Sequence, residues 1–337
     1  MHTISRRKML ELAAIGSVAL NSGIASAFAQ PAPAKRIDRL DPDLDKIISA
    51  SEPIKVLAEG YGGDRGQAEG PVWWKDKEGG YLLFSDINNS RRIKYTPGQG
   101  ATIFRENTNR ANGLTRDMQG RLVACEADAK RVTRLEPDGS ITVIAGGYQG
   151  KQLGRPNDVV VKSDGGIYFT DPQGGAAGSP WEVSSPGTYC VAPDFSAMWL
   201  LTDTLLAPNG LAFSPDESVL YIADSRRRHI RAFDLLPNGT LALQTDRVFV
   251  DLNGAEPGVP DGIKVDSQGN VYSGGSGGLY VIDAKGKKLG RIIHGGQNTT
   301  NMAFGGDDWK TLYFTSRNFL GSVNIKVAGL PVPGRKA

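Results

Sequence analysis

The sequence is poor in histidine and cysteine, the side chains that most often bind transition metals. Of its 337 residues, three are histidines and two are cysteines. Neither His229 nor His294 has a second His or Cys at ligand spacing, and His2 lies in a predicted signal segment, so a site built from His and Cys is not expected. Cys125 and Cys190 each fall in an apolar, strand-like pattern. We expect two separate buried thiols, with a disulfide as the alternative.

The chain also lacks a long hydrophobic run and a concentration of one charge. No window holds 18 uninterrupted apolar residues, so no transmembrane helix is expected. The formal net charge is +3, of which residues 1–29 carry +2. A nucleic-acid-binding protein needs a concentrated basic face, and the densest basic stretch, three arginines at 226–228, falls where a solvated loop is expected. We therefore expect no nucleic-acid partner.

The first 29 residues are typical of an export signal. Residues 5–10, with arginines at 6 and 7, fit a twin-arginine signal, a weakly apolar stretch follows to residue 24, and Ala-Phe-Ala at 27–29 is a cleavage motif. We expect a periplasmic protein without membrane attachment after cleavage; a basic amphipathic helix is the alternative. The predicted boundaries are 1–29 for the signal peptide, 30–52 for a linker and short helix, and 53–337 for the folded domain.

The most informative feature of the chain is a repeat. Six times, a polar residue stands ten to thirteen residues before a hydrophobic strand, and the strand anchors are 40, 45, 53, 51 and 41 residues apart. The pairs are Glu69 and Leu82, Asn112 and Leu122, Asn157 and Ile167, Asn209 and Leu220, Asp261 and Val271, and Asn301 and Leu312. This period predicts an all-β, six-bladed β-propeller with four-stranded antiparallel blades.

Details along the chain agree with this fold. Turn sequences such as 163–166 (Ser-Asp-Gly-Gly) separate the first two strands of each predicted blade. The isolated strand at 54–57 is expected to join the last blade and close the ring. Residues 172–187 interrupt the rhythm with glycines and prolines. They form either a loop that contacts substrate or a loop in solvent.

The six polar residues are candidates for a cation site. If each opens the inner strand of its blade, two carboxylates and four amide oxygens converge on one channel, which suits Ca²⁺. The alternative is turn chemistry, because Asn112-Gly113, Asn209-Gly210 and Asp261-Gly262 are strong turn dipeptides. Turns do not explain Glu69 or the recurring offset of ten to thirteen residues to the next strand. Mg²⁺, Mn²⁺ and Zn²⁺ are the alternative ions.

A serine hydrolase and a nucleotide-dependent enzyme find little support. Residues 274–278 (Gly-Gly-Ser-Gly-Gly) match G-x-S-x-G, but that motif requires a strand, a sharp turn and a helix. Here a strand-like segment follows at 279–282, so Ser276 is interpreted as part of a blade turn. No Walker A or dinucleotide-binding motif is present.

At these residues the chain resembles the SMP-30/gluconolactonase/LRE family of six-bladed, calcium-dependent propellers. The resemblance covers roughly residues 37–335 and rests on five stretches: 69–73 (Glu-Gly-Pro-Val-Trp), 155–161 (Arg-Pro-Asn-Asp-Val-Val-Val), 166–172 (Gly-Ile-Tyr-Phe-Thr-Asp-Pro), 208–216 (Pro-Asn-Gly-Leu-Ala-Phe-Ser-Pro-Asp) and 260–263 (Pro-Asp-Gly-Ile). It implies that Glu69, Asn157, Asn209 and Asp261 bind the metal. It further implies that Asp261 transfers protons, and that Arg155 and Asn112 contact the sugar.

The chain departs from the family at three places near the expected pocket mouth. It has Cys125-Glu126-Ala127 where many bacterial members have Cys-Glu-His, Asp-Pro-Gln-Gly at 171–174, and a glycine-rich stretch at 62–67. The resemblance implies a Ca²⁺-dependent hydrolase of a sugar lactone or similar cyclic ester, with Asp261 as base or nucleophile. The alternatives are a hydrolase of another ester, a phosphotriester or a modified glycoside, and a sugar-binding propeller without catalysis.

Overall fold

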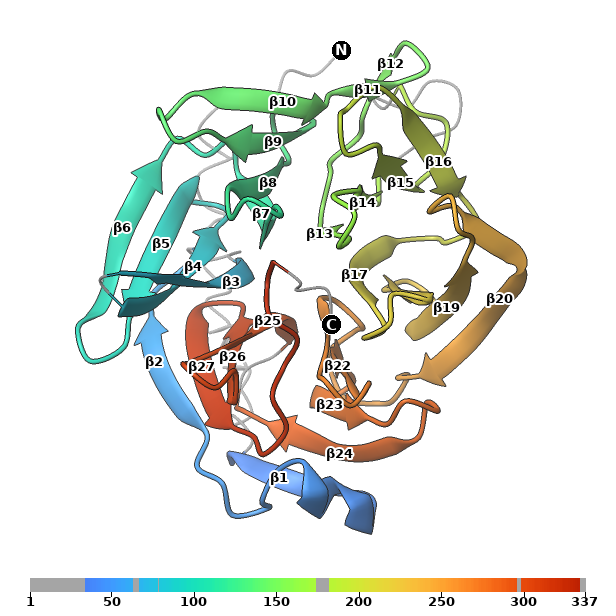
Figure 1. Cartoon of the computed structure of the whole chain (residues 1–337). Coiled ribbons are helices and arrows are strands. Elements are labelled where there is room, and N and C mark those ends of the chain that lie inside the picture. Colours follow the sequence, from blue (N-terminus) through green and yellow to red (C-terminus); the bar gives the residue numbers. More distant parts are fainter. Residues whose placement is uncertain (1–33, 63–66, 78, 174–181, 296–297, 334–337) are drawn as a thin grey trace, which may run out of the picture. The chain divides into compact units, whose positions relative to one another are not determined.

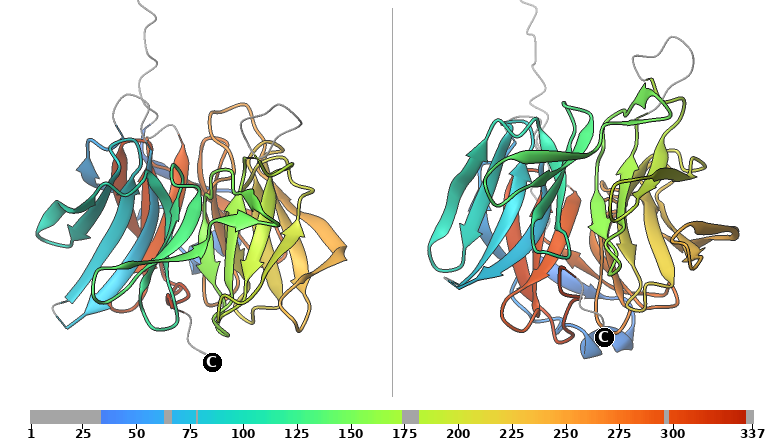
Figure 2. Two further views of the ribbon diagram at one scale, coloured as in Figure 1. Left: turned by 90° about the horizontal axis from the view of Figure 1, so that it is seen from above. Right: turned by 45° about the horizontal axis from the view of Figure 1, so that its top comes forward.

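The computed structural model describes residues 34–62, 67–77, 79–173, 182–295 and 298–333. Within this part of the chain, six small antiparallel sheets surround a central axis, as Figure 1 shows along the axis and Figure 2 from the side. The predicted six-bladed β-propeller is therefore confirmed. The predicted signal peptide lies outside the described residues. In the described part, no helix is long and apolar enough to span a membrane.

Each blade places one strand at the axis and the following strands successively farther out. The blades are, in order, β3 (Ala68–Asp76), β4 (Gly79–Asp86), β5 (Arg91–Thr96) and β6 (Gly100–Glu106); β7 (Ala111–Arg116), β8 (Leu122–Glu126), β9 (Arg131–Leu135) and β10 (Ile141–Ala145); β13 (Val159–Val161), β14 (Ile167–Asp171), β15 (Gly187–Val191) and β16 (Met198–Thr202); β17 (Pro208–Phe213), β18 (Val219–Asp224), β19 (His229–Leu235) and β20 (Leu241–Asp251); β21 (Ile263–Val265), β22 (Val271–Gly275), β23 (Gly278–Ile282) and β24 (Lys288–Ile293); and β25 (Thr299–Gly305), β26 (Thr311–Ser316) and β27 (Phe319–Asn324). A short hairpin, β11 (Gly147–Tyr148) with β12 (Lys151–Gln152), lies between blades two and three.

The N-terminal part of the domain closes the ring. β2 (Lys55–Glu59) pairs with β27 as the outer strand of blade six, as predicted for residues 54–57. β1 (Arg36–Arg39) adds a fifth strand to blade five by pairing with β24, although its residues were assigned to a linker from the sequence. Between them lies a 3₁₀ helix, η1 (Pro42–Lys46), within the segment 30–52 for which a short helix was predicted, and its Leu44 is fully buried.

A separate hydrophobic cluster fills each interface between neighbouring blades. The two-residue alternation of a strand explains how one blade supplies two clusters. In β14, Ile167 and Phe169 pack toward blade two, whereas Tyr168 packs toward blade four. Cys125 and Cys190 belong to different clusters and are both free thiols, as expected.

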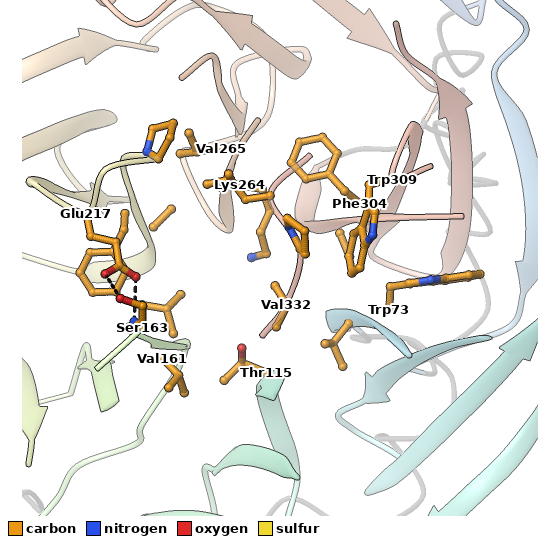
Figure 3. Close-up of a pocket in the computed structure, with 18 of the residues that line it drawn as sticks. Trp73, Thr115, Val161, Ser163, Glu217, Lys264, Val265, Phe304, Trp309 and Val332 are labelled. Carbon is orange, nitrogen blue, oxygen red and sulfur yellow. Dashed lines mark hydrogen bonds between the residues drawn. The ribbon is translucent and has the colours of Figure 1, made fainter. Parts of the chain in front are cut away.

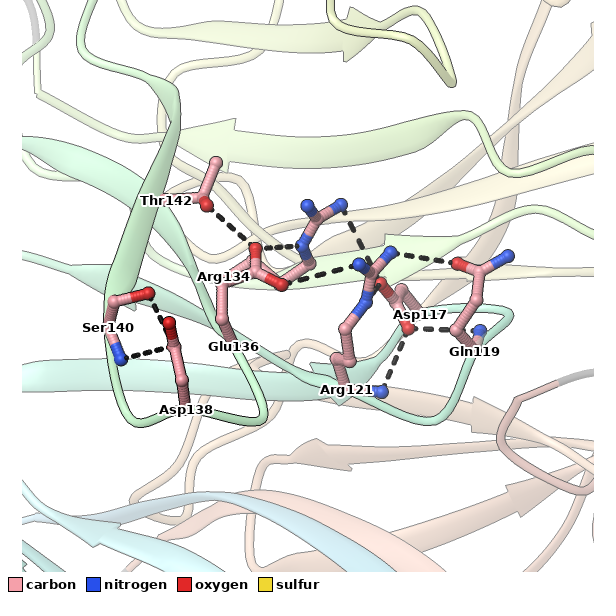
Figure 4. Close-up of polar contacts among 8 residues, drawn as sticks. All are labelled: Asp117, Gln119, Arg121, Arg134, Glu136, Asp138, Ser140 and Thr142. Atoms are coloured by element: carbon pink, nitrogen blue, oxygen red, sulfur yellow. Dashed lines mark hydrogen bonds and ion pairs between the residues drawn. The ribbon is translucent and has the colours of Figure 1, made fainter.

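Aspartates fix the turns between the first two strands of the blades. In blade two, the Asp117 carboxylate accepts hydrogen bonds from the backbone N–H groups of Gln119 (3.0 Å) and Arg121 (2.8 Å), and Arg121 Nε lies 2.7 Å from Asp117 Oδ2 (Figure 4). Asp164, Asp216, Asp266 and Asp308 likewise accept from the N–H two residues ahead. Aspartate at the first position of a tight turn makes this local bond, so the predicted hairpin turns are confirmed.

The pH dependence of stability should report on His294, which follows β24. Its ring is 2% exposed and lies against Phe314 and Phe319, and burial, aided by the charge of Lys35, lowers its pKa to about 4. Because the unfolded chain protonates this histidine near pH 6.5, its contribution is complete above that pH. The contribution, on the order of 3 kcal/mol, is lost as the pH falls toward 4.

A His294→Gln variant should therefore lose less unfolding free energy than the parent protein between pH 7 and pH 4. Denaturant titrations at several pH values would measure the unfolding free energy of both proteins. Subtracting the variant's value from the parent's at each pH cancels the contribution of the other titrating groups. Parallel losses in the two proteins would contradict the assignment.

Candidate functional site

The hub residues of four blades lie in or beside irregular positions of the inner strands. The pairing register shifts between Glu69 and Val72, Ala111 and Leu114, Pro208 and Leu211, and Thr299 and Asn301. Such a bulge re-aims side chains relative to the regular pleat. Asn112-Gly113 and Asn209-Gly210 thus belong to strands β7 and β17, and the alternative interpretation of these dipeptides as turns is wrong.

The glycines after the hub residues are required by the close approach of neighbouring inner strands. A Cβ atom on Gly113 would lie 2.7 Å from the carbonyl oxygen of Asn157, and one on Gly262 would lie 2.7 Å from Asn301 Cα. The Gly113 N–H donates to that same Asn157 oxygen at 2.8 Å. At Gly113 and Gly262 the neighbouring strands therefore leave no room for a side chain. In blade three, the corresponding position is occupied by Asp158, not by glycine.

Three buried carboxyl groups from different blades lie close enough at the hub for their charges to interact. Asn301 Nδ2 donates to Glu69 Oε2 at 3.1 Å and to Asp158 Oδ2 at 3.2 Å, which brings blades one, three and six together. The third carboxyl group, Asp261, is 6% exposed and has Asn298 Nδ2 at 3.4 Å from Oδ2. Glu69 also accepts from the Gly70 N–H at 2.6 Å.

This grouping makes negative charge costly. Burial, and next the charge of Asp158, raise the pKa of Glu69 to about 8. Burial also raises the pKa of Asp158, and burial with the charges of Glu69 and Asp158 raises the pKa of Asp261 well above its ordinary value. The positive charge of Lys264 acts against these shifts at Glu69 and Asp158. A cation at the hub would relieve the remaining repulsion.

The backbones of the predicted amide ligands are firmly held. The Asn209 carbonyl accepts from Thr170 Oγ1 at 2.7 Å, and its side chain interacts with Ser225 and Asp261. The Asn157 N–H donates to the Thr170 carbonyl at 2.8 Å. Of the four predicted ligands, side-chain interactions thus link Glu69, Asn209 and Asp261, while Asn157 is placed through its backbone beside Asp158.

Asn112, predicted to contact the sugar, has a buried amide oxygen that lacks a hydrogen-bond partner among the described residues. Its carbonyl oxygen accepts from Ser85 Oγ at 2.7 Å, which fixes the residue between blades one and two. Buried polar atoms are normally satisfied. The free oxygen of Asn112 is therefore a feature that a bound ligand or cation would explain.

Arg155, the other predicted sugar contact, lies on the loop that leads to Asn157. Its N–H and that of Gly154 donate to the two oxygens of Asp171 at 2.7 and 2.6 Å, and burial raises the pKa of Asp171 to about 6. The Arg155 side chain reaches Asp128, with Nη2 at 3.3 Å from Oδ1, and does not pair with the hub carboxylates.

The described residues include only part of the three stretches in which the sequence departs from the family pattern. Glu126 is buried and accepts hydrogen bonds from Asn109, Arg131 and Thr133, so it fixes the end of β8. Residues 63–66 and 174–181, which fall in the other two departures and in the long loop, lie outside the described residues. Ser276 donates to the Glu256 carbonyl at 2.7 Å in the turn between β22 and β23, which agrees with its interpretation as a turn residue.

Sequence reasoning missed two residues of the hub, Asp158 and Lys264. A signal for Asp158 was available: Glu69, Asn112, Asn209 and Asp261 are each followed by glycine, whereas Asn157 is followed by an acid. No comparable signal pointed to Lys264. Its position on the short strand β21 reads as an ordinary polar residue in a strand pattern.

Beyond the hub, the channel opens into a cavity of about 390 Å³ on the side of the hairpin turns. Its walls are largely apolar and include residues of all six inner strands or their turns, together with the C-terminal residues 330–332. Figure 3 shows the Lys264 nitrogen directed toward the middle of the lining residues, with Glu217 and Ser163 farther out.

The fold and the hub place the protein in the class of six-bladed β-propellers that carry acidic and amide side chains at the central axis. Residues 67–318 match the family model described as the SMP-30/Gluconolactonase/LRE-like region, and the chain belongs to this family. It is 30% identical to a gluconolactonase from Zymomonas mobilis over 97% of this chain and 99% of that protein. It is also 30% identical to a pentonolactonase from Haloferax volcanii over 74% and 80% of the two chains.

The solved structures agree with the sequence relatives. A gluconolactonase from Xanthomonas campestris superposes with a TM-score of 0.77 at 30% identity, over 88% of this chain and 97% of that one. A calcium-binding regucalcin from Agrobacterium tumefaciens has a TM-score of 0.68 at 19% identity, over 85% and 98% of the two chains. The second likeness supports the fold alone. The family, the gluconolactonase matched over its length and the similar solved gluconolactonase define a hydrolase of the lactonase type.

The close approach at the hub can be tested with glycine substitutions. Gly262→Ala should destabilise the protein by about 1–3 kcal/mol, because the new methyl group would overlap the side chain of Asn301. Gly146→Ala is the matched control, since its Cβ would make only ordinary contact, 3.8 Å from Val143 Cγ1. Thermal unfolding of both variants in EDTA measures the effect, and equal melting temperatures would show that the approach is not constraining.

Proposed function

We propose that this protein hydrolyses a sugar lactone in a reaction that depends on a divalent cation at the propeller hub. The observation that carries the proposal is the burial of Glu69, Asp158 and Asp261 together at the hub of a chain that belongs to a lactonase family. Buried acids with raised pKa values in a channel are typical of functional sites. The named activities of these two relatives, the gluconolactonase and the pentonolactonase, support a sugar lactone as substrate.

The residues at the hub fit a hard cation. Glu69 and Asp261 offer carboxylate oxygens and Asn157 and Asn209 offer amide oxygens, a donor set that suits Ca²⁺. The partnerless oxygen of Asn112 points to the same need for a positive group. Among the described residues, no three His, Cys, Asp or Glu side chains form a metal-binding group on their own, so the amides would share the coordination. Mg²⁺, Mn²⁺ and Zn²⁺ are the alternatives to be compared.

When bound, the cation would polarise the ester carbonyl and stabilise the oxyanion that forms. Asp261 would act on water as a general base, or attack the carbonyl carbon directly. Its raised pKa means that it needs positive charge beside it to be ionised near neutral pH. Arg155, on a loop fixed by Asp171, would orient hydroxyl groups of the substrate, and Asn112 would donate or accept at the sugar. Residues 1–29 support export to the periplasm by the twin-arginine route as part of the same proposal.

Removal of the metal should abolish hydrolysis. After EDTA treatment, the protein should not turn over glucono-1,5-lactone, and readdition of Ca²⁺ should restore activity. At a concentration about 100-fold above the dissociation constant, Ca²⁺ should also stabilise the fold by about 2.7 kcal/mol, measured by thermal unfolding. Full activity in EDTA would contradict the proposal.

Asp261→Asn should lower kcat by about 10²–10⁴-fold, because this is the usual contribution of a general base. Asp164→Asn, in a hairpin turn, is the matched control and should retain activity. A panel of lactones, aryl esters and phosphotriesters identifies the substrate class. Undiminished lactonase activity in Asp261→Asn would refute the role of this residue. Sugar binding without turnover of any panel member would identify a non-catalytic propeller.

A further inference from the structure

Lys264 brings a positive charge to the hub from the side of the hairpin turns that join the first two strands of each blade. It lies in β21, and its Nζ donates to Asn301 Oδ1 at 3.2 Å and to the Ile263 carbonyl at 3.0 Å. Its side chain borders the apolar cavity on the hairpin side. An ammonium group in such surroundings is expected to be bound to a negative partner.

The hydrogen bonds of Asn301 show what Lys264 does there. The amide oxygen of Asn301 accepts from Lys264 and from the Met302 N–H at 2.8 Å. Its nitrogen is therefore turned the other way and donates to both Glu69 and Asp158. Lys264 thus fixes the orientation of the amide that joins two of the three buried carboxylates.

The charges at the hub lead to a specific count. Glu69, Asp158 and Asp261 supply three negative charges when ionised, one more than a divalent cation neutralises. Lys264 supplies one positive charge. A single divalent cation together with Lys264 would leave the hub neutral, whereas the cation alone would leave one buried carboxylate without a countercharge, which is costly.

We propose that Lys264 is a built-in countercharge for Asp158, transmitted through Asn301, and that it sets the hub to accept a cation of charge +2. The residue is a positioning and specificity-determining group for the ion and does not touch the substrate. The inference rests on the proposed cation site. It extends that site by assigning the third carboxylate to Lys264 and not to the ion.

Ion charge provides a direct test, because Coulomb energy scales with the charge of the bound ion. Removing a nearby positive charge favours a trivalent ion over a divalent one of similar radius, and removing a negative charge does the opposite. Tb³⁺ and Ca²⁺ form such a pair. The quantity to measure is the ratio of the Ca²⁺ to the Tb³⁺ dissociation constant, by calorimetry on the whole protein without substrate.

Four variants separate charge from structure. Lys264→Met should raise the ratio by at least about tenfold, and Asp158→Asn should lower it by a similar factor. The double variant Lys264→Met/Asp158→Asn should return within about threefold of the parent protein. Lys264→Arg keeps the charge and should leave the ratio unchanged. Because the side chain borders a cavity, the Met and Arg variants have room to fold, and thermal unfolding checks each protein.

Each outcome decides a separate question. Opposite shifts in the two single variants and recovery in the double variant would support the countercharge. An unchanged ratio in Lys264→Met or in Asp158→Asn, with Ca²⁺ still bound, would overturn it while leaving the proposed function intact. A ratio changed equally in Lys264→Arg and Lys264→Met would show that geometry, not charge, is responsible. A parent protein that binds neither ion would refute the proposed cation site itself.

Discussion

Neighbouring inner strands of this propeller approach so closely at the axis that the backbone of one blade fills the space where the next would place a side chain. Gly113 and Gly262 show the constraint, since each lies directly against the hub residue of the following blade. Short hydrogen bonds across the same contacts, such as Gly262 N–H to the Thr300 carbonyl at 2.7 Å, fix the position of each blade relative to the next. The polar hub residues have no freedom to spread apart. Their convergence follows from backbone packing and not from attraction between side chains.

This forced convergence has an electrostatic cost. Three carboxyl groups lie where water has little access, and the blade-to-blade hydrophobic clusters hold them there. Burial opposes ionisation of each, and each ionised group opposes the next. Such a hub is stable in one of two ways: the acids keep their protons, or positive charge enters the channel. A site that recruits a cation to neutralise itself also presents that cation to any carbonyl oxygen that reaches the channel.

The sequence revealed the ring more completely than the hub. The repeat of polar residue and strand predicted six blades because each blade buries both faces of its strands and therefore repeats the same pattern. It also identified Glu69 and Asp261, which break the run of amides. Asp158 was missed because it directly follows Asn157, and the repeat assigned only one polar hub residue to each blade. Lys264 was missed because its role depends on reaching Asn301 across a blade boundary, and β1 because a four-residue strand has no period of its own.

The hub and the loops of the propeller differ in how much substitution they can accept. Hub residues are confined by close backbone contact, so substitution there changes the charge of the site or breaks the fold. The loop that carries Arg155 is held by Asp171, whereas Glu126 ends strand β8, where Thr133 Oγ1 donates to it at 3.0 Å. Such loops tolerate changes in length and sequence while the scaffold remains. Because the departures from the family pattern at 62–67, 125–127 and 171–174 lie outside the hub residues, they leave the buried carboxyl and amide groups of the hub unchanged.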